Sequence, residues 1–168
     1  MQNMVGNHIL IHGLFYAAVF TGYLLLMMVT TNPRVWGYAD YSDEIKAKIP
    51  PQTKEERGKA ILWAIPLMIF AMGFPIYSSI QLKNELGDDA SFWLFFLNLL
   101  VMVSLVYLVD LVILDWLIVS KITPKFVVID GTEVSDYKDF SHHYRAQLRA
   151  VPILIVICLI FAAIMTIL

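Results

Sequence analysis

Four runs of apolar residues, each long enough to cross a lipid bilayer, dominate this sequence. They cover residues 8–29, 61–82, 92–119 and 150–168. A transmembrane helix needs roughly 20 mainly apolar residues to cross the hydrocarbon core. None of the runs alternates polar and apolar residues with a period of two, so barrel strands are not indicated. The sequence therefore predicts an all-α integral membrane protein, with four transmembrane helices in an antiparallel bundle.

The composition agrees with one membrane domain that covers residues 1–168. Hydrophobic residues make up 59% of the chain and charged residues only 15%, which is far from the composition of a soluble domain. The net charge of −2 gives no support for binding to nucleic acid. The expected partner is the lipid bilayer, and the sequence indicates no particular partner protein.

The basic residues are distributed very unevenly between the predicted loops. Of the twelve Lys and Arg residues, Lys83 alone lies in the short loop 83–91, and the other eleven lie in the long loops 30–60 and 120–149. Loops rich in Lys and Arg stay in the cytoplasm. We therefore expect a multi-pass protein of the inner cell membrane, with both termini outside and both long loops cytoplasmic.

The two long loops contain signals for short secondary structures. In residues 42–49 a serine cap precedes two isoleucines four residues apart, which predicts a short surface helix. Residues 53–56 have the capping-box pattern of a helix start. In residues 122–134 a β-branched run is followed by Asp-Gly, a pair that favours a type I′ turn. This last pattern predicts a small β-hairpin.

Two carboxyl groups, Asp110 and Asp115, interrupt the third apolar run. Ionisable residues inside a membrane usually face the bundle interior, find a partner and mark a functional site. On a straight α-helix, residues five apart diverge by about 140°. A paired-carboxylate site is therefore not expected.

A polar pocket at the cytoplasmic face is the leading hypothesis for these aspartates. Tyr107 lies one turn before Asp110 on the same helix face. The basic residues expected to complete the pocket are Arg34, Lys125, Arg145 and Arg149. The alternative is a structural ion pair that holds the inner helix ends together, with Arg34, Lys59, Lys121, Arg145 or Arg149 as the possible cation.

His8 and His12 form a second pair of candidate ligands, because residues four apart share one helix face. This spacing suits a divalent metal such as zinc, but a metal site generally needs a third protein ligand. The acidic residues of the loop 83–91 are expected at the same end of the bundle. His142 and His143 are expected to be titrating surface histidines.

Small residues repeat at four-residue spacing in the first run, at Gly13, Ala17 and Thr21. Such stripes let two helices approach closely in a membrane. Because four helices leave little room for a conduction path, a homodimer formed through this stripe is one expectation.

Several passages resemble an uncharacterised family of small four-span membrane proteins from bacteria and archaea. In the first long loop the passages are NPRVW, DYSDEI and IPPQTKEE. At the end of the third apolar run and in the second long loop the passage is LDWLIVSKITPKFVVIDGTE. The resemblance covers about a third of the chain and implies four spans with two cytoplasmic loops. It implies no activity. It directs attention to residues expected at the inner membrane face, which are Asn32, Arg34, Asp115, Thr123, Pro124, Lys125, Gly131 and Thr132.

Three classes of function are compatible with these observations. The leading hypothesis is a ligand-binding or transport-type protein with a pocket around Asp110 and Asp115. The second is an accessory or assembly subunit of a larger membrane complex. The third is a membrane-embedded enzyme that acts on a lipid headgroup. The sequence contains no Walker loop, nucleophile elbow, zinc-protease motif or dinucleotide fingerprint, so enzymatic chemistry has no sequence signature.

Overall fold

The protein is built from four long helices. The computed structural model describes residues 2–168. The long helices are α1 (Gln2–Thr30), α4 (Lys54–Leu86), α5 (Phe92–Val109) with its continuation η2 (Asp110–Ile122), and α6 (Ser141–Ile167). All four are long and apolar enough to cross a membrane, which confirms the predicted multi-pass helical architecture.

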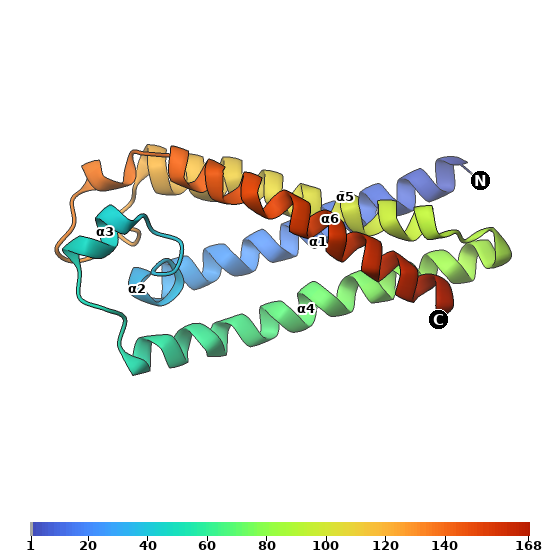
Figure 1. Ribbon diagram of the computed structural model, residues 1–168, viewed down its shortest axis with the longest axis horizontal. Coiled ribbons are helices and arrows are strands. Elements are labelled where there is room, and N and C mark those ends of the chain that lie inside the picture. The colour runs from blue at the N-terminus through green and yellow to red at the C-terminus, as the bar shows by residue number, and fades with distance from the viewer. Residues whose placement is uncertain (1) are drawn as a thin grey trace.

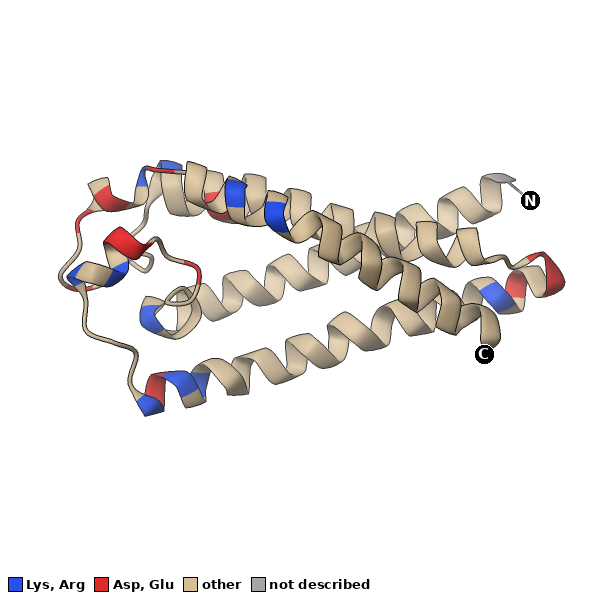
Figure 2. Cartoon of the chain, viewed as in Figure 1, with Lys and Arg blue, Asp and Glu red and all other residues tan. Residues whose placement is uncertain are grey.

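The bundle has two different ends (Figure 1). Both termini lie at one end together with the short α4–α5 connection, which contains the 3₁₀ turn η1 (Gly87–Asp89). We call this the turn end. The opposite end, which we call the loop end, carries both long connections. Figure 2 shows most charged residues at the loop end, a smaller group at the turn end, and few between them.

Side-chain caps define the first long connection. Asn32 accepts a hydrogen bond from the Arg34 backbone at the start of α2 (Pro33–Trp36). Ser42 caps α3 (Asp43–Lys48), which confirms the predicted short helix. However, Ile45 and Ile49 are buried in a protein core. The protein itself therefore covers the apolar side of α3, and the position of α3 relative to the membrane surface stays a prediction.

The predicted capping box starts α4. Thr53 Oγ1 accepts a hydrogen bond from the Glu56 backbone at 3.2 Å, and Glu56 Oε2 accepts one from the Thr53 backbone at 2.7 Å. These two bonds satisfy N–H groups that the helix start would otherwise leave without partners. The helix then continues to Leu86.

The small-residue stripe on α1 is used within the chain. A Cβ on Gly13 would lie 3.0 Å from Leu105 Cδ1 and 3.3 Å from Val101 Cγ1, so α1 approaches α5 closely at this point. Ala17 and Thr21 are buried as well. Because α5 packs against Gly13, the stripe joins two helices of the same chain, and the expected homodimer stays a prediction.

Two prolines lie inside α4, and two tyrosines of α1 donate hydrogen bonds to backbone carbonyls near them. Pro75 has no N–H to offer the Ala71 carbonyl, and Tyr16 Oη donates to that carbonyl instead, at 3.0 Å. Tyr23 Oη donates to the Trp63 carbonyl, in the turn before Pro66, at 2.8 Å. Neighbouring helices commonly satisfy backbone groups freed by proline in membranes. These bonds tie α4 to α1.

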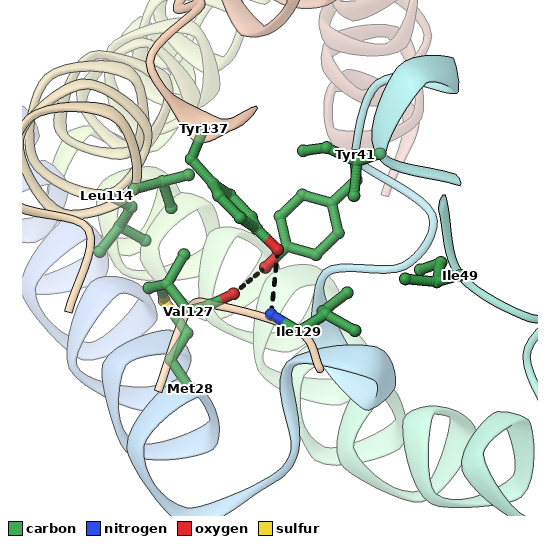
Figure 3. Packing of buried hydrophobic residues seen from close by; sticks show 9 residues of the cluster. Met28, Tyr41, Ile49, Leu114, Val127, Ile129 and Tyr137 are labelled. Atoms are coloured by element: carbon green, nitrogen blue, oxygen red, sulfur yellow. Dashed lines mark hydrogen bonds between the residues drawn. The ribbon is translucent and has the colours of Figure 1, made fainter. Parts of the chain in front are cut away.

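Both long connections fold together into one apolar core at the loop end. Figure 3 shows Tyr41 and Tyr137 pointing into this core toward Val127 and Ile129. Tyr41 Oη donates to the Val127 carbonyl at 3.0 Å, and Tyr137 Oη accepts from the Ile129 N–H at 3.0 Å. Burial raises the pKa of Tyr41, so its hydroxyl stays protonated and remains a donor. Tyr137 ends the 3₁₀ turn η3 (Val134–Tyr137).

The predicted β-hairpin was wrong, because residues 2–168 contain no strand. The tyrosine hydroxyls occupy backbone groups of Val127 and Ile129 that a hairpin ladder would need. The Asp-Gly turn itself forms, since the Thr132 N–H donates to the Ile129 carbonyl at 3.0 Å. Gly131 is the only turn residue with a positive φ, at 94°, which fits a type II turn and not type I′.

Candidate functional site

A cavity of about 480 Å³ lies at the loop end, next to the apolar core. Three long helices supply its walls, and the segment between α2 and α3 supplies its remaining side. Its polar or aromatic lining residues are Phe20 on α1, Trp36, Asp40 and Tyr41 in the first connection, Tyr107, Asp110 and Asp115 on α5 and η2, and His142, His143 and Gln147 on α6. Most of the other lining residues are aliphatic or methionine.

The two aspartates line this cavity together, contrary to the divergence expected for a straight α-helix. The reason is a change in helix winding at Asp110, where α5 gives way to the π-helix η2. Backbone bonds in a π-helix join residues five apart, so residues five apart share one face. At the end of η2 the Thr123 N–H donates to the Ile118 carbonyl at 2.8 Å, which is a bond of this kind. Wider winding therefore places both carboxyl groups on the cavity side.

Each aspartate has a neutral or titratable partner on α6. Asp110 Oδ2 accepts a hydrogen bond from Gln147 Nε2 at 3.1 Å. Asp115 Oδ1 lies 3.2 Å from His143 Nδ1. Gln147 and His143 are four residues apart, so they share one face of α6. Two residues five apart on η2 therefore contact two residues four apart on α6, and each contact is polar.

The four basic residues expected beside the aspartates lie elsewhere. Arg34 pairs with Glu56, with Nε 2.6 Å from Oε1, and also donates to the Pro50 and Pro51 carbonyls. These bonds fasten the first connection to the start of α4 and engage most of the guanidinium. Lys125 is exposed on the second connection. Neither residue lines the cavity.

The other two expected cations lie near the cavity without lining it. Arg145 and Arg149 are exposed on α6 and line a smaller neighbouring cavity. They point to this second cavity because α6 turns His143 and Gln147 toward the aspartates. The structure therefore brings together Tyr107, Asp110 and Asp115, and it separates them from the four cations.

The charge balance of the larger cavity is one-sided. Its lining includes three carboxyl groups, those of Asp40, Asp110 and Asp115, and within the described chain no Lys or Arg joins them. A carboxyl group away from water and without a basic partner is stable only when a proton or another cation neutralises it. The cavity is therefore suited to protons or cations and unsuited to anions.

One donor in the cavity lining has no partner. Trp36 Nε1 is buried and makes no hydrogen bond to any described residue. Buried indole N–H groups usually find an acceptor, so Trp36 has capacity to donate one more bond. Ser120 Oγ, on η2, is likewise without a partner among the described residues.

The two histidines near the N-terminus belong to a separate polar cluster toward the turn end. His8 Nε2 lies 3.1 Å from the Ser78 carbonyl, and His12 Nδ1 lies 2.8 Å from Ser78 Oγ. Asn98 Nδ2 donates to Ser78 Oγ at 3.1 Å and to Ser79 Oγ at 3.2 Å. This turn-end cluster joins α1, α4 and α5 through side chains that satisfy one another.

The predicted metal pair gains no third ligand from the described part of the chain. No group of three His, Cys, Asp or Glu residues there is arranged to hold a metal ion. Glu85 approaches only His8, with its Oε2 3.6 Å from Nδ1. Ser78 engages a nitrogen of each imidazole, so hydrogen bonding accounts for the pair without a metal.

Sequence reasoning missed several residues of the larger cavity. His143 and Gln147 have the i, i+4 spacing of a shared face, but only the π-helical winding of η2 shows that this face meets the aspartates. His143 is 13% exposed at its side chain, so the expectation of a surface histidine was wrong for this residue. Asp40 and Trp36 reach the cavity because the first connection folds back over the helix ends.

Comparisons with protein-family models, with characterised proteins and with solved structures found no match.

Proposed function

We propose that this protein binds a small organic cation in the loop-end cavity, on the cytoplasmic side of the cell membrane. The observation that carries the proposal is the charge balance of the cavity, with three carboxyl groups and, among the described residues, no Lys or Arg in its lining. The cytoplasmic side follows from the eleven basic residues in the two long loops.

The remaining lining supports an organic cation over a bare metal ion. The aromatic residues Phe20, Trp36, Tyr41 and Tyr107 offer faces to which an ammonium or phosphonium group is attracted. The aliphatic residues between them suit hydrocarbon groups on the same ligand. The volume of about 480 Å³ lies within the range of roughly 300–1,000 Å³ found for small-molecule sites.

A transport-type role would require the bundle to open toward the turn end. An apolar cluster of Tyr16, Ala17, Met102 and Val106, with Phe70 and Phe74 packed on it, lies on that side of the cavity. The packed cluster leaves the cavity without a polar route across the bundle. Binding at the loop end is therefore the core of the proposal, and movement of this cluster is the additional step that transport needs.

Two ions of equal shape and opposite charge test the proposal. Tetraphenylphosphonium and tetraphenylborate are titrated separately into the purified, detergent-solubilised protein, and binding is followed by isothermal calorimetry. We expect saturable binding of the phosphonium only. Charge-assisted contacts are worth about 1.5–3 kcal/mol, so Asp110→Asn with Asp115→Asn should weaken binding by about tenfold or more.

Asp89→Asn, in the exposed turn-end loop, is the matched control and should bind as the unchanged protein does. Equal isotherms for the double variant and the unchanged protein would contradict the proposal. Preferential binding of the borate would contradict it as well.

A further inference from the structure

A second cavity, of about 280 Å³, adjoins the first at the loop end. It lies between α3, η3 and the start of α6, and its lining is largely polar and charged. The two cavities share five lining residues, which are Tyr41, Val119, His142, His143 and Ala146. These shared residues form the partition between a largely apolar chamber, which holds the half-buried carboxyl groups of Asp110 and Asp115, and a polar chamber at the protein surface.

His143 is the group in this partition that contacts a buried carboxyl group. Its Nδ1 lies 3.2 Å from Asp115 Oδ1, and both side chains are largely buried, at 13% and 18% exposure. His142 differs, because its Nε2 lies 3.1 Å from the Asp40 backbone carbonyl, which can only accept a hydrogen bond. That contact holds a proton on His142 Nε2 and leaves His143 as the connection to Asp115.

We infer that His143 relays protons between Asp115 in the larger cavity and water in the second cavity. The inference rests on the proposed function, because a cation that binds beside a protonated Asp115 displaces its proton. The O–H bond of Asp115 breaks as an N–H bond forms at His143 Nδ1, which leaves a carboxylate and an imidazolium. The N–H bond at Nε2 then breaks, and water in the second cavity takes the proton.

The groups that line the two cavities around His143 carry charges of both signs. The acidic ones are Asp110 and Asp115 on η2, Asp40, Asp43 and Glu44 in the first connection, Asp136 on η3, which pairs with Lys48, and Asp139 before α6. The others are Tyr41, Tyr137, His142, Arg145 and Arg149. A transient imidazolium would lie beside the Asp115 carboxylate that forms in the same step, and these two opposite charges attract each other. Because the second cavity is lined by charged groups, it suits water as the final acceptor.

A stopped-flow experiment tests the relay. The detergent-solubilised protein is mixed with tetraphenylphosphonium in weakly buffered solution that contains a pH indicator. Tryptophan fluorescence reports binding, and the indicator reports proton release. In the unchanged protein we expect binding to be accompanied by proton release. In His143→Ala and His143→Gln we expect release to slow by about a hundredfold or more, the usual contribution of a positioned acid–base group.

Added imidazole separates a relay from a structural role. Imidazole is small enough for the second cavity and should restore the rate of proton release in His143→Ala. If His143 only supported packing, an added proton carrier would not restore that rate. Lys125→Gln, outside both cavities, is the control and should release protons at the original rate.

Four outcomes overturn the inference. Binding without proton release removes the relay and leaves the proposed function intact. Release at the original rate in both His143 variants, or slowed release that imidazole does not restore, also rejects His143 as the route. Absence of saturable binding in the unchanged protein rejects the proposed function and the relay with it.

Discussion

The two ends of this bundle both bury polar side chains, but they do so in different ways. At the turn end, the five residues His8, His12, Ser78, Ser79 and Asn98 satisfy one another across three helices. At the loop end, Asp110 and Asp115 face a cavity, with Gln147 and His143 as their partners and no Lys or Arg among the described lining residues. Closed polar clusters hold helices together, whereas open ones leave interactions for a ligand. This difference is the basis for proposing a structural role for the turn end and a binding role for the loop end.

The largest expected effect on stability is at the turn end, with Asn98→Ala. Asn98 is fully buried and donates to both serines, so its loss leaves their hydroxyls under-satisfied and creates a cavity. We expect a loss of about 2 kcal/mol in the free energy of unfolding. Unfolding in mixed micelles of increasing denaturing detergent measures it.

Ser104→Ala, an exposed position on the same helix, is the control and should change stability little. The affinity of Asn98→Ala for tetraphenylphosphonium should stay within about twofold of the original, less than 0.5 kcal/mol. A large loss of affinity with little loss of stability would reverse the roles assigned to the two ends.

A smaller effect is expected between the two ends, with Tyr16→Phe. The variant keeps the aromatic packing but removes the donor to the Ala71 carbonyl that Pro75 leaves without a partner. Interhelical hydrogen bonds in membranes are worth about 0.6 kcal/mol on average, so a loss of that size in unfolding free energy is expected. Tyr144→Phe, at an exposed tyrosine of α6, should change the same measurement less. Equal losses in the two variants would show that the Ala71 bond does not stabilise α4.

The smallest effect on stability is expected for Asp110→Asn at the loop end. The asparagine retains an oxygen that can accept from Gln147 and carries no charge that needs neutralisation. The unfolding free energy should therefore remain within about 0.5 kcal/mol of the original or increase. A loss as large as that of Asn98→Ala would show that Asp110 has a structural role, and the contrast between the ends would disappear.

Local sequence signals predicted most of the fold. The lengths of the apolar runs predict the four helices, and the caps at Ser42 and Thr53 predict the starts of α3 and α4, because each signal acts within a few residues. The hairpin prediction failed because Val127 and Ile129 make their decisive contacts with Tyr41 and Tyr137. Such contacts between segments distant in sequence are not contained in a β-branched run.

The candidate site was predictable in part. The sequence identified Asp110, Asp115 and Tyr107, since a carboxyl group inside an apolar run is conspicuous. The sequence also predicted Arg34 beside these residues, because the first connection returns to the same membrane face. In the structure the Arg34 guanidinium pairs with Glu56 instead. The partners His143 and Gln147 depend on the π-helical winding of η2, which no local pattern in residues 110–122 announces.

A crystal structure with tetraphenylarsonium tests the central claim most directly. This ion has the shape and charge of the phosphonium, and its arsenic atom can be located by anomalous scattering. We predict one arsenic peak inside the loop-end cavity, next to the carboxyl groups of Asp110 and Asp115 and enclosed by Trp36 and Tyr41. An empty cavity at a saturating concentration of the ion, with arsenic found only on the lipid-facing surface of the helices, would contradict the account.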